Sequence, residues 1–340
     1  MTGTPVAGKP GTYLLVLDMP EMMEAYERVG LQLPDVAFFK KRQQGLAAKL
    51  QEVIPECSLE TIEANKLTNK IVGSLHDLLA VTPEAVVIST VAAVASKTNG
   101  HCMQVNRIVD PKGHYLGVGP RPGNASLHSQ FADIKGSLEK RPVILVEDGS
   151  FSGGTMKCMI EICNELQIEI HCLVIGFLFA SAMETIRKVF PREKDIHYWR
   201  EESFLDWMPD HDFYPFVPNA GKVVGFSYNA NHIVRHMPVY LHSGLSLCMP
   251  YILPYGNPAE WASIPEEHAK KFSTFCLQEA RTIFWEMERI NNQKITLESL
   301  IGTYPHVSLP VGSSGRNEFP RIKTRIVDVL HQHEMAVALW

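Results

Sequence analysis

The sequence lacks any long hydrophobic run. Its longest apolar stretch, residues 173–182, is far shorter than the ~20 residues that a membrane-spanning helix needs, and Gly176 and Ser181 interrupt it. The stretch is typical of a buried strand, and we expect no membrane partner. No positively charged segment followed by an apolar one opens the chain, so we also expect no secretory signal.

Cysteine patterns typical of zinc sites or of disulfide scaffolds are missing too. The seven cysteines are odd in number and form no C-x-x-C pair, which argues against a zinc ribbon and against a disulfide framework. Reduced cysteines, together with 13 methionines, are typical of a cytosolic protein. We therefore expect a cytoplasmic location.

An excess of positive charge is also absent. The chain has 32 Lys and Arg against 37 Asp and Glu, a net charge of −5, whereas a nucleic-acid-binding protein needs a basic face. We therefore do not expect nucleic acid as a partner. The hydrophobic fraction is 45%, too high for a disordered chain. A length of 340 residues suits one large domain or two ordinary ones.

Hydrophobic patterns predict alternating strands and helices in the middle of the chain. The predicted strands are residues 13–17, 85–90, 101–109, 142–146, 170–179 and 223–228. The predicted helices are residues 36–53, 58–80, 91–97, 155–166, 182–190, 265–292 and 321–335. Such alternation favours an α/β fold with a mostly parallel sheet and flanking helices. We expect this core at residues 81–230, an N-terminal strand and helical segment at 1–80, and a mainly helical C-terminal extension at 231–340.

One segment, residues 143–155, has the features of a phosphate-binding site. An apolar strand ends in two acids, a short loop of small residues follows, and a helix then begins. Ligands of open α/β sheets bind at the carboxyl ends of strands. A helix N-terminus presents free N–H groups and positive dipole charge to an anion. Gly153 and Gly154 allow close approach of the backbone, and Ser152 and Thr155 add hydroxyl donors.

The two acids of this segment, Glu147 and Asp148, suggest a different task. They could accept hydrogen bonds from sugar hydroxyls or face a Mg²⁺ ion through water. Phosphate beside two carboxylates is otherwise repulsive, so we expect a bridging cation. No lysine precedes Thr155, so the segment is not a Walker A loop. The alternative is an ordinary strand-to-helix turn with a solvated acid pair and an N-cap serine.

The segment resembles the PRPP-binding motif of the type I phosphoribosyltransferases, in which an apolar strand, two acids, a short loop and Ser/Thr-Gly-x-Thr follow one another. The resemblance implies that Glu147 and Asp148 hold the ribose hydroxyls of PRPP and face Mg²⁺, and that residues 151–155 cradle the 5-phosphate. The implied substrate-binding residues are Glu147, Asp148, Gly149, Ser150, Phe151, Ser152, Gly153, Gly154 and Thr155. The family fold implied is a phosphoribosyltransferase-like core.

Two further loops of the family have counterparts here. The pyrophosphate loop would be residues 89–95, although this stretch has no glycine, acid or lysine and also suits a strand packed on an alanine-rich helix. The loop that closes over the reaction would be the Gly- and Pro-rich stretch 110–130, unless that stretch is a plain surface excursion. Its Lys112 or Arg121 would neutralise the departing pyrophosphate and would be catalytic, together with Asp148. The other polar candidates of this loop are His114 and His128.

Two details concern the acceptor. Some purine-salvage members keep a proton-accepting acid inside the phosphate loop, and the matching residue here is Phe151. Residues 212–218 and 223–228 are loosely similar to the base-binding hood of those enzymes, where an aromatic ring could stack on a base. Core packing accounts for the same aromatic residues equally well.

The sequence thus predicts a pentosyltransferase that binds PRPP and Mg²⁺ and transfers the phosphoribosyl group to a small-molecule acceptor, with a nucleobase as one option. The alternative from another class is a non-catalytic PRPP or nucleotide sensor, and a third is a phosphohydrolase that uses Glu147 and Asp148 on a metal. Asp18, which follows the first strand, fits a strand-end or helix-cap residue better than a phosphatase nucleophile. The sequence leaves a homodimer open.

Overall fold

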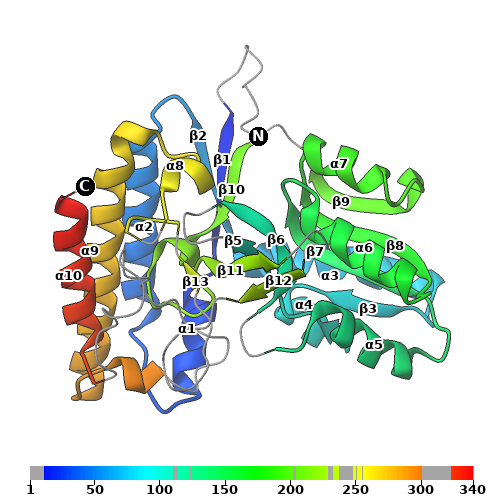
Figure 1. The fold of residues 1–340 in the computed structure, drawn as a ribbon, viewed down its shortest axis with the longest axis horizontal. Coiled ribbons are helices and arrows are strands. Elements are labelled where there is room, and N and C mark those ends of the chain that lie inside the picture. The colour runs from blue at the N-terminus through cyan, green and yellow to red at the C-terminus, as the bar shows by residue number, and fades with distance from the viewer. Residues whose placement is uncertain are drawn as a thin grey trace. The chain divides into compact units, whose positions relative to one another are not determined.

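The fold is α/β, as the sequence predicts, and Figure 1 shows it for the computed structural model. The structure describes residues 11–109, 114–121, 124–201, 204–228, 233–236, 248–249, 251–254, 256–300 and 323–339. The chain divides into two compact units, each discontinuous in sequence. Unit 1 consists of Met1–Thr61, Ile108–Leu116 and Leu205–Trp340, and unit 2 consists of Ile62–Arg107 and Gly117–Phe204.

Unit 2 contains a parallel sheet with the strand order β4-β3-β7-β8-β9. The strands are β3 (Val86–Ser89), β4 (His101–Cys102), β7 (Val143–Ser150), β8 (Ile170–Leu178) and β9 (Ile196–Glu201). The first four residues of β7, Val-Ile-Leu-Val, are fully buried. A continuous apolar run of this kind is typical of a parallel strand that is covered on both faces.

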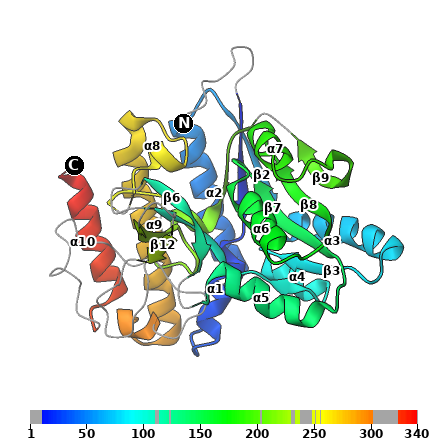
Figure 2. The ribbon, with the colours of Figure 1, turned by 45° about the vertical axis from the view of Figure 1, so that its right-hand side comes forward.

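Helices cover both faces of this sheet (Figures 1 and 2). The helices are α3 (Ala64–Val81), α4 (Ala92–Lys97), α5 (Leu127–Leu138), α6 (Gly154–Glu165) and α7 (Ala180–Arg187). The connection from β3 to β4 steps across the sheet in one direction, whereas those from β7 to β8 and from β8 to β9 step in the other. Right-handed crossovers then put α4 on one face and α6 and α7 on the opposite face. Consistently, α3 packs against α4, and α5 packs against α6.

Two further sheets have the strand orders β10-β1-β2 and β12-β11-β5-β6, and β13 pairs with β11. The strands are β1 (Thr12–Leu17), β2 (Ser58–Glu63), β5 (Val105–Val109), β6 (Tyr115–Pro120), β10 (Phe204–Pro209), β11 (Lys222–Tyr228), β12 (Ile233–His236) and β13 (Cys248–Met249). The chain passes between the units within β2, β5, β6 and β10.

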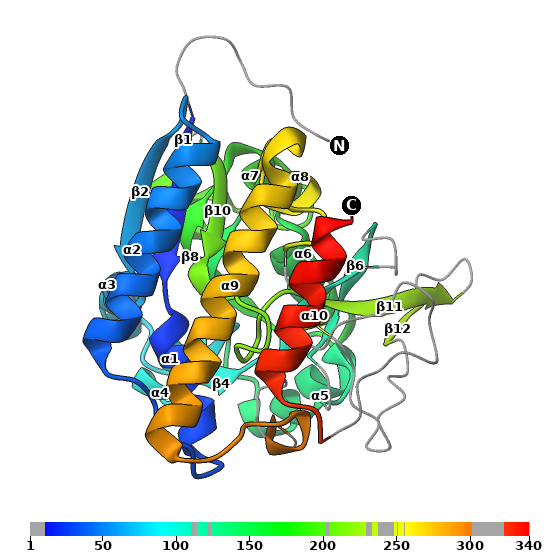
Figure 3. The same cartoon turned by 90° about the vertical axis from the view of Figure 1, so that its left-hand side faces the viewer.

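The helices of unit 1 pack around a long helix, α9 (Figure 3). They are α1 (Met19–Glu27), α2 (Val36–Val53), α8 (Pro258–Trp261), α9 (Glu266–Asn291) and α10 (Ile326–Ala338). Apolar side chains of α9 are buried at helical spacing, including Phe272, Cys276 and Ile283. Ion pairs add to the packing: Arg42–Glu279 joins α2 to α9 at 3.0 Å, and Arg281–Glu334 joins α9 to α10 at 3.0 Å. Within the described residues, no helix has the length and apolar character needed to cross a membrane.

Several predicted elements agree closely with the structure, and three do not. The predicted helix at 58–80 was wrong in its first six residues, because Ser58–Glu63 forms strand β2 beside β1. The predicted strand at 101–109 is two strands, β4 and β5, which belong to different sheets. The stretch 110–130 was expected to be a loop, but it contains β6 and the start of α5. Residues 110–113 and 122–123 of this stretch lie outside the described residues.

The division into units also differs from the expected boundaries. The sequence places boundaries after residues 80 and 230. In the structure the chain leaves unit 1 after Thr61 and after Leu116, and it leaves unit 2 after Arg107 and after Phe204. The parallel core therefore begins about one helix earlier than expected and ends before the hood-like stretch 212–228.

Candidate functional site

The acid pair lies inside strand β7 and not after its end. The sequence predicts that the strand stops at Val146, but pairing with β8 continues to Ser150, which lies opposite Leu178. Glu147 and Asp148 are consecutive residues near the carboxyl end of β7, where Glu147 is buried and Asp148 is half-buried.

Glu147 is a buried acid whose Oε2 has no hydrogen-bond partner among the described residues. Burial, and then the negative charge of Asp148, raise its pKa to about 8. The hydroxyls of Ser150 and Thr155 and the positive charge of Arg107 oppose this rise. Without a bound ligand, the Glu147 carboxyl group is therefore mostly protonated at neutral pH.

The Ser150 hydroxyl lies close enough to Glu147 to lower its pKa, but it forms no well-aligned hydrogen bond with any described residue. Ser150 is 2% exposed, and its Oγ has no hydrogen-bond partner in the part of the chain that the structure describes. Buried polar atoms in folded proteins are nearly always hydrogen-bonded, so an unsatisfied pair needs a physical reason. A ligand that supplies the missing hydrogen bonds is such a reason.

Helix α6 begins at Gly154, four residues after Ser150. Its N-cap residue, Gly153, has φ +77° and offers no side-chain cap to the first turn. A Cβ atom at Gly153 would lie 2.9 Å from the Ala182 carbonyl oxygen and 2.9 Å from Thr185 Cβ. Only glycine avoids both the left-handed strain and the collision. The N–H groups of the first turn, which lack intrahelical partners, are thus left uncapped for an anion.

The loop between β7 and α6 is held by groups that follow β8. The Phe179 N–H donates to the Ser150 carbonyl oxygen at 3.1 Å, and the Ser181 hydroxyl donates to the Phe151 carbonyl oxygen at 2.6 Å. Both bonds fix carbonyl oxygens of the loop. Its conformation is therefore set before any ligand binds.

The strand order places this loop at a topological switch point. Connections leave β3 and β7 in opposite directions along the sheet, so the carboxyl ends of these two neighbouring strands are not covered by a shared crossover. Ligands of open α/β sheets bind at such points. Ser89 lies opposite Val146 in the register, and the turn after β3, Thr90–Val91, therefore lies beside the acid pair.

The turn after β3 is where the sequence places the pyrophosphate loop. Here the Thr90 N–H donates to the Val146 carbonyl oxygen at 3.0 Å, and the Val91 N–H donates to the Ser89 Oγ at 3.0 Å. Helix α4, which follows, has six residues and begins without a side-chain cap. These two N–H groups are therefore already engaged within the protein.

The structure describes only part of the closing loop that was expected to supply cations. Lys112 lies outside the described residues. Arg121 donates its backbone N–H to the Gln104 carbonyl oxygen at 2.9 Å, and its charge acts on the Cys102 thiol of β4, whose pKa burial raises. His128 is an exposed residue of α5. Arg107 of β5, which acts on Glu147, was missed because it sits inside a predicted strand and carries no motif.

The hood-like aromatic residues are part of the hydrophobic core of unit 1. Phe213, Tyr214 and Phe216 are fully buried, and Phe213 packs edge-on against Phe272 of α9 at 5.3 Å. They are not exposed for stacking on a base, and the core-packing interpretation is confirmed for them. The side chains of residues 223–228 lie outside the described set.

Asp18 is the N-cap residue of α1, as its position after the first strand suggests. Its carboxylate does not cap the helix but accepts a hydrogen bond from His211 Nδ1 at 2.7 Å. Asp210 supplies the cap instead: its Oδ1 accepts the backbone N–H groups of Asp18 at 2.9 Å and of Met19 at 2.7 Å. The group joins α1 to the short 3₁₀ helix at residues 210–213 and forms no open site.

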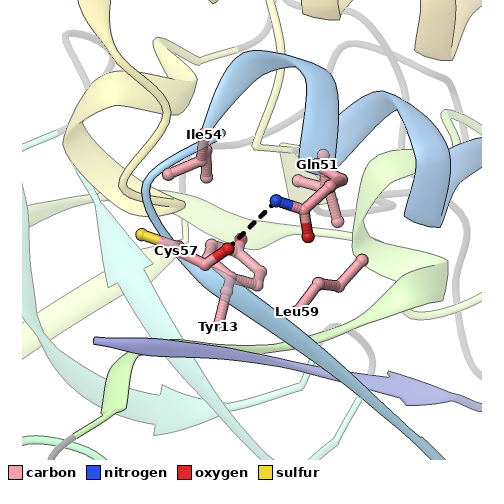
Figure 4. A pocket seen from close by; sticks show the side chains of 6 residues that line it. Tyr13, Gln51, Ile54, Cys57 and Leu59 are labelled. Atoms are coloured by element: carbon pink, nitrogen blue, oxygen red, sulfur yellow. Dashed lines mark hydrogen bonds between the residues drawn. The ribbon is translucent and has the colours of Figure 1, made fainter. Parts of the chain in front are cut away.

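A hollow in unit 1 and the metal-binding side chain types of the described residues give no support for a second site. One hollow in unit 1 has no room for a water molecule (Figure 4), and it is lined by Tyr13, Leu50, Gln51, Ile54, Cys57 and Leu59. In the described part of the chain, no three His, Cys, Asp or Glu side chains are grouped so that they could hold a metal ion. The end of β7 therefore remains the candidate site.

Comparison with known proteins finds weak structural likeness only. No family model and no curated protein matches the chain. Among solved structures, adenine phosphoribosyltransferase from Thermoanaerobacter pseudethanolicus is similar over 43% of this chain and 83% of its own, with 11% identity and a TM-score of 0.25. TT1426 from Thermus thermophilus is similar over 42% of this chain and 82% of its own, with 16% identity and a TM-score of 0.24. Functional inference therefore depends on the residues of the site.

Proposed function

We propose that the protein is a phosphoribosyltransferase-like enzyme, which binds PRPP with Mg²⁺ and transfers the phosphoribosyl group to a small-molecule acceptor as pyrophosphate leaves. One observation carries the proposal. Two adjacent acids and an uncapped helix N-terminus with a glycine N-cap lie together at the switch point of a parallel sheet. The unsatisfied Glu147 Oε2 and Ser150 Oγ support a polar ligand at this point.

The chain's own groups have distinct tasks in such a reaction. The bond from the anomeric carbon to pyrophosphate breaks as the bond to the acceptor forms, so the protein must orient both partners and exclude water. The N–H groups at the start of α6 and the hydroxyls of Ser150 and Thr155 would bind the 5-phosphate. Glu147 and Asp148 would accept hydrogen bonds from the ribose hydroxyls. In this role the Glu147 carboxyl has to lose its proton when the substrate binds.

The residues at the site fit a Mg²⁺ ion that arrives with its substrate. Mg²⁺ at phosphate sites is held by one or two carboxylates and by phosphate oxygens, and it keeps several waters. Glu147 and Asp148 offer that number of carboxylates, and no third ligand of the described chain joins them. When bound, the ion would supply positive charge that neutralises the leaving pyrophosphate. Arg107 is a cation of the chain itself that already acts on Glu147.

Substitution of the acid pair tests the proposal. We expect Asp148→Asn to lower PRPP-dependent turnover at least ten-fold, because the loss of one charged hydrogen bond costs about 1.5–3 kcal/mol. The double variant Glu147→Gln, Asp148→Asn should show no measurable turnover. The measurement is pyrophosphate release with PRPP, Mg²⁺ and a panel of nucleobases and other small nucleophiles.

A matched control separates the chemistry from the fold. Glu165→Gln removes an exposed acid at the far end of α6 and should leave pyrophosphate release unchanged. Both acid-pair variants should fold, since Asn and Gln keep the side-chain shape and remove the repulsion between the two acids. Turnover equal to wild type in the double variant would contradict the proposal.

The second candidate is a protein that senses PRPP or nucleotides without turnover. The observation in its favour is the turn after β3, where the N–H groups of Thr90 and Val91 are engaged internally and no cation follows until Lys97. Binding of PRPP, seen as a rise in melting temperature, without pyrophosphate release for any acceptor would favour the sensor.

A further inference from the structure

Phe151 is a large apolar side chain that the fold leaves exposed. Its side chain lies in the loop between β7 and α6 and is 42% exposed, whereas the neighbouring Phe179 is 4% exposed. Single exposed apolar residues are common on protein surfaces and have no meaning by themselves. The position and the rigidity of this ring are what distinguish it.

The ring of Phe151 is held in place before any ligand binds. It packs edge-on against Phe179, with the ring centroids 4.7 Å apart and the planes at 63°. The hydroxyl of Ser181 holds the Phe151 carbonyl oxygen, and the Phe179 N–H holds that of Ser150. A rigid aromatic group loses little conformational entropy when a ligand packs on it.

The ring also stands next to the groups that suit an anion. Phe151 directly follows Ser150, whose buried hydroxyl is unsatisfied, and it precedes the glycine N-cap of α6 by two residues. A ligand that places a phosphate at the helix N-terminus therefore has a fixed apolar surface within its reach. A planar ring system is the chemical group that gains most from such a surface.

We infer that Phe151 is a specificity-determining residue, on which the planar heterocycle of the acceptor and of the nucleotide product stacks. The inference rests on the proposed function and names its acceptor class: an aromatic heterocycle, not an aliphatic amine or an alcohol. The phenyl ring has no hydrogen-bonding group. It therefore selects for a flat apolar face and does not distinguish one heterocycle from another.

The test compares ligands that share the phosphate and differ in the base. Dissociation constants for ribose 5-phosphate and for a panel of nucleoside monophosphates are measured by calorimetry with wild type, Phe151→Ala and Phe151→Tyr. Loss of a base-stacking residue weakens binding about 5- to 100-fold. We expect Phe151→Ala to weaken nucleotide binding by at least five-fold more than ribose 5-phosphate binding, and Phe151→Tyr to restore it.

Tyr198→Ala is the matched control. It removes an aromatic ring of similar exposure (41%) from β9, the edge strand two positions away from β7, and should weaken neither ligand. Equal weakening of both ligands by Phe151→Ala would overturn the stacking role and leave the proposed function standing. If wild type binds neither ligand, the proposed function fails and the inference fails with it.

Discussion

At the scale of single residues, the candidate site depends on Gly153. Its motif position is evident in the sequence, because a glycine follows Ser152 in the Ser-Gly-x-Thr pattern. The physical reason for glycine is not evident there. It comes from the left-handed backbone and from the approach of Ala182 and Thr185, residues that lie about thirty positions further along the chain.

Gly153→Ala should destabilise the protein. The substitution puts a Cβ atom in a left-handed conformation and 2.9 Å from the Ala182 carbonyl oxygen, so we expect a loss of about 1–3 kcal/mol in unfolding free energy. Urea denaturation followed by circular dichroism measures it. Gly136→Ala is the control: this exposed glycine lies inside α5, nothing is within 4 Å of its added Cβ, and the change should stabilise by about 0.5–1 kcal/mol. A neutral Gly153→Ala would show that the loop relaxes freely.

The properties of Glu147 depend on contacts that are distant in the sequence. The motif predicts that this acid binds a ligand, and the residue type alone suggests an ordinary ionised carboxylate. Its burial, and the extension of β7 through Ser150, come from pairing with β8 and from the helices that cover the sheet. These contacts are distant in sequence, so a local pattern cannot predict the pKa of about 8.

At the scale of elements, local patterns predict those whose apolar residues recur regularly. The helix at Val36–Val53 is predicted to the residue, and α9 within one residue at either end. Ser58–Glu63 was predicted helical because it runs into a helix of good periodicity, but β1 and β10 provide a sheet that it joins. Gly and Pro in 110–130 suggested a loop, although Gly117 and Pro120 lie within strand β6. Tertiary pairing outweighs local preference at both places.

The contact between His211 and Asp18 joins two elements of unit 1 and should make stability depend on pH. Burial lowers the pKa of His211, but the charges of Asp18, Asp212 and Asp210 outweigh burial and raise it to about 9. Its ordinary value is about 6.5. A group with a raised pKa stabilises the fold fully below the unfolded value, and this contribution is lost as the pH rises through the folded value.

Unfolding free energy should therefore fall between about pH 6.5 and pH 9.5, by up to about 3 kcal/mol from this histidine. His211→Gln should be less stable than wild type at pH 6.5 and should lose this part of the pH dependence, as measured by urea denaturation across the range. His128→Gln, which changes an exposed residue of α5, should keep the wild-type slope. An unchanged slope in His211→Gln would mean that other groups cause the dependence.

At the scale of the whole molecule, the sequence predicts the α/β class and the parallel core but not the division of the chain. Each unit is assembled from separated segments, and the chain passes four times between them. Composition does not change at these points, because they fall inside strands such as β5 and β10 that look like any other. The predicted boundaries follow changes in periodicity, which mark elements and not the cores to which they belong.

The separate cores lead to a prediction about where ligand binding stabilises the molecule. The acid pair, the loop to α6 and the turn after β3 all belong to unit 2, so a ligand held there should slow opening of that unit. With PRPP and Mg²⁺, amide hydrogen exchange should slow in residues 143–165 and 86–97, and it should stay unchanged in α9 and α10 of unit 1. Mass spectrometry of peptic fragments measures both regions in one experiment, and Asp148→Asn serves as the control in which the slowing is lost. Equal slowing in α9 and in β7 would mean that both units hold the ligand, because stabilisation confined to one core does not reach hydrogen bonds that open independently of it.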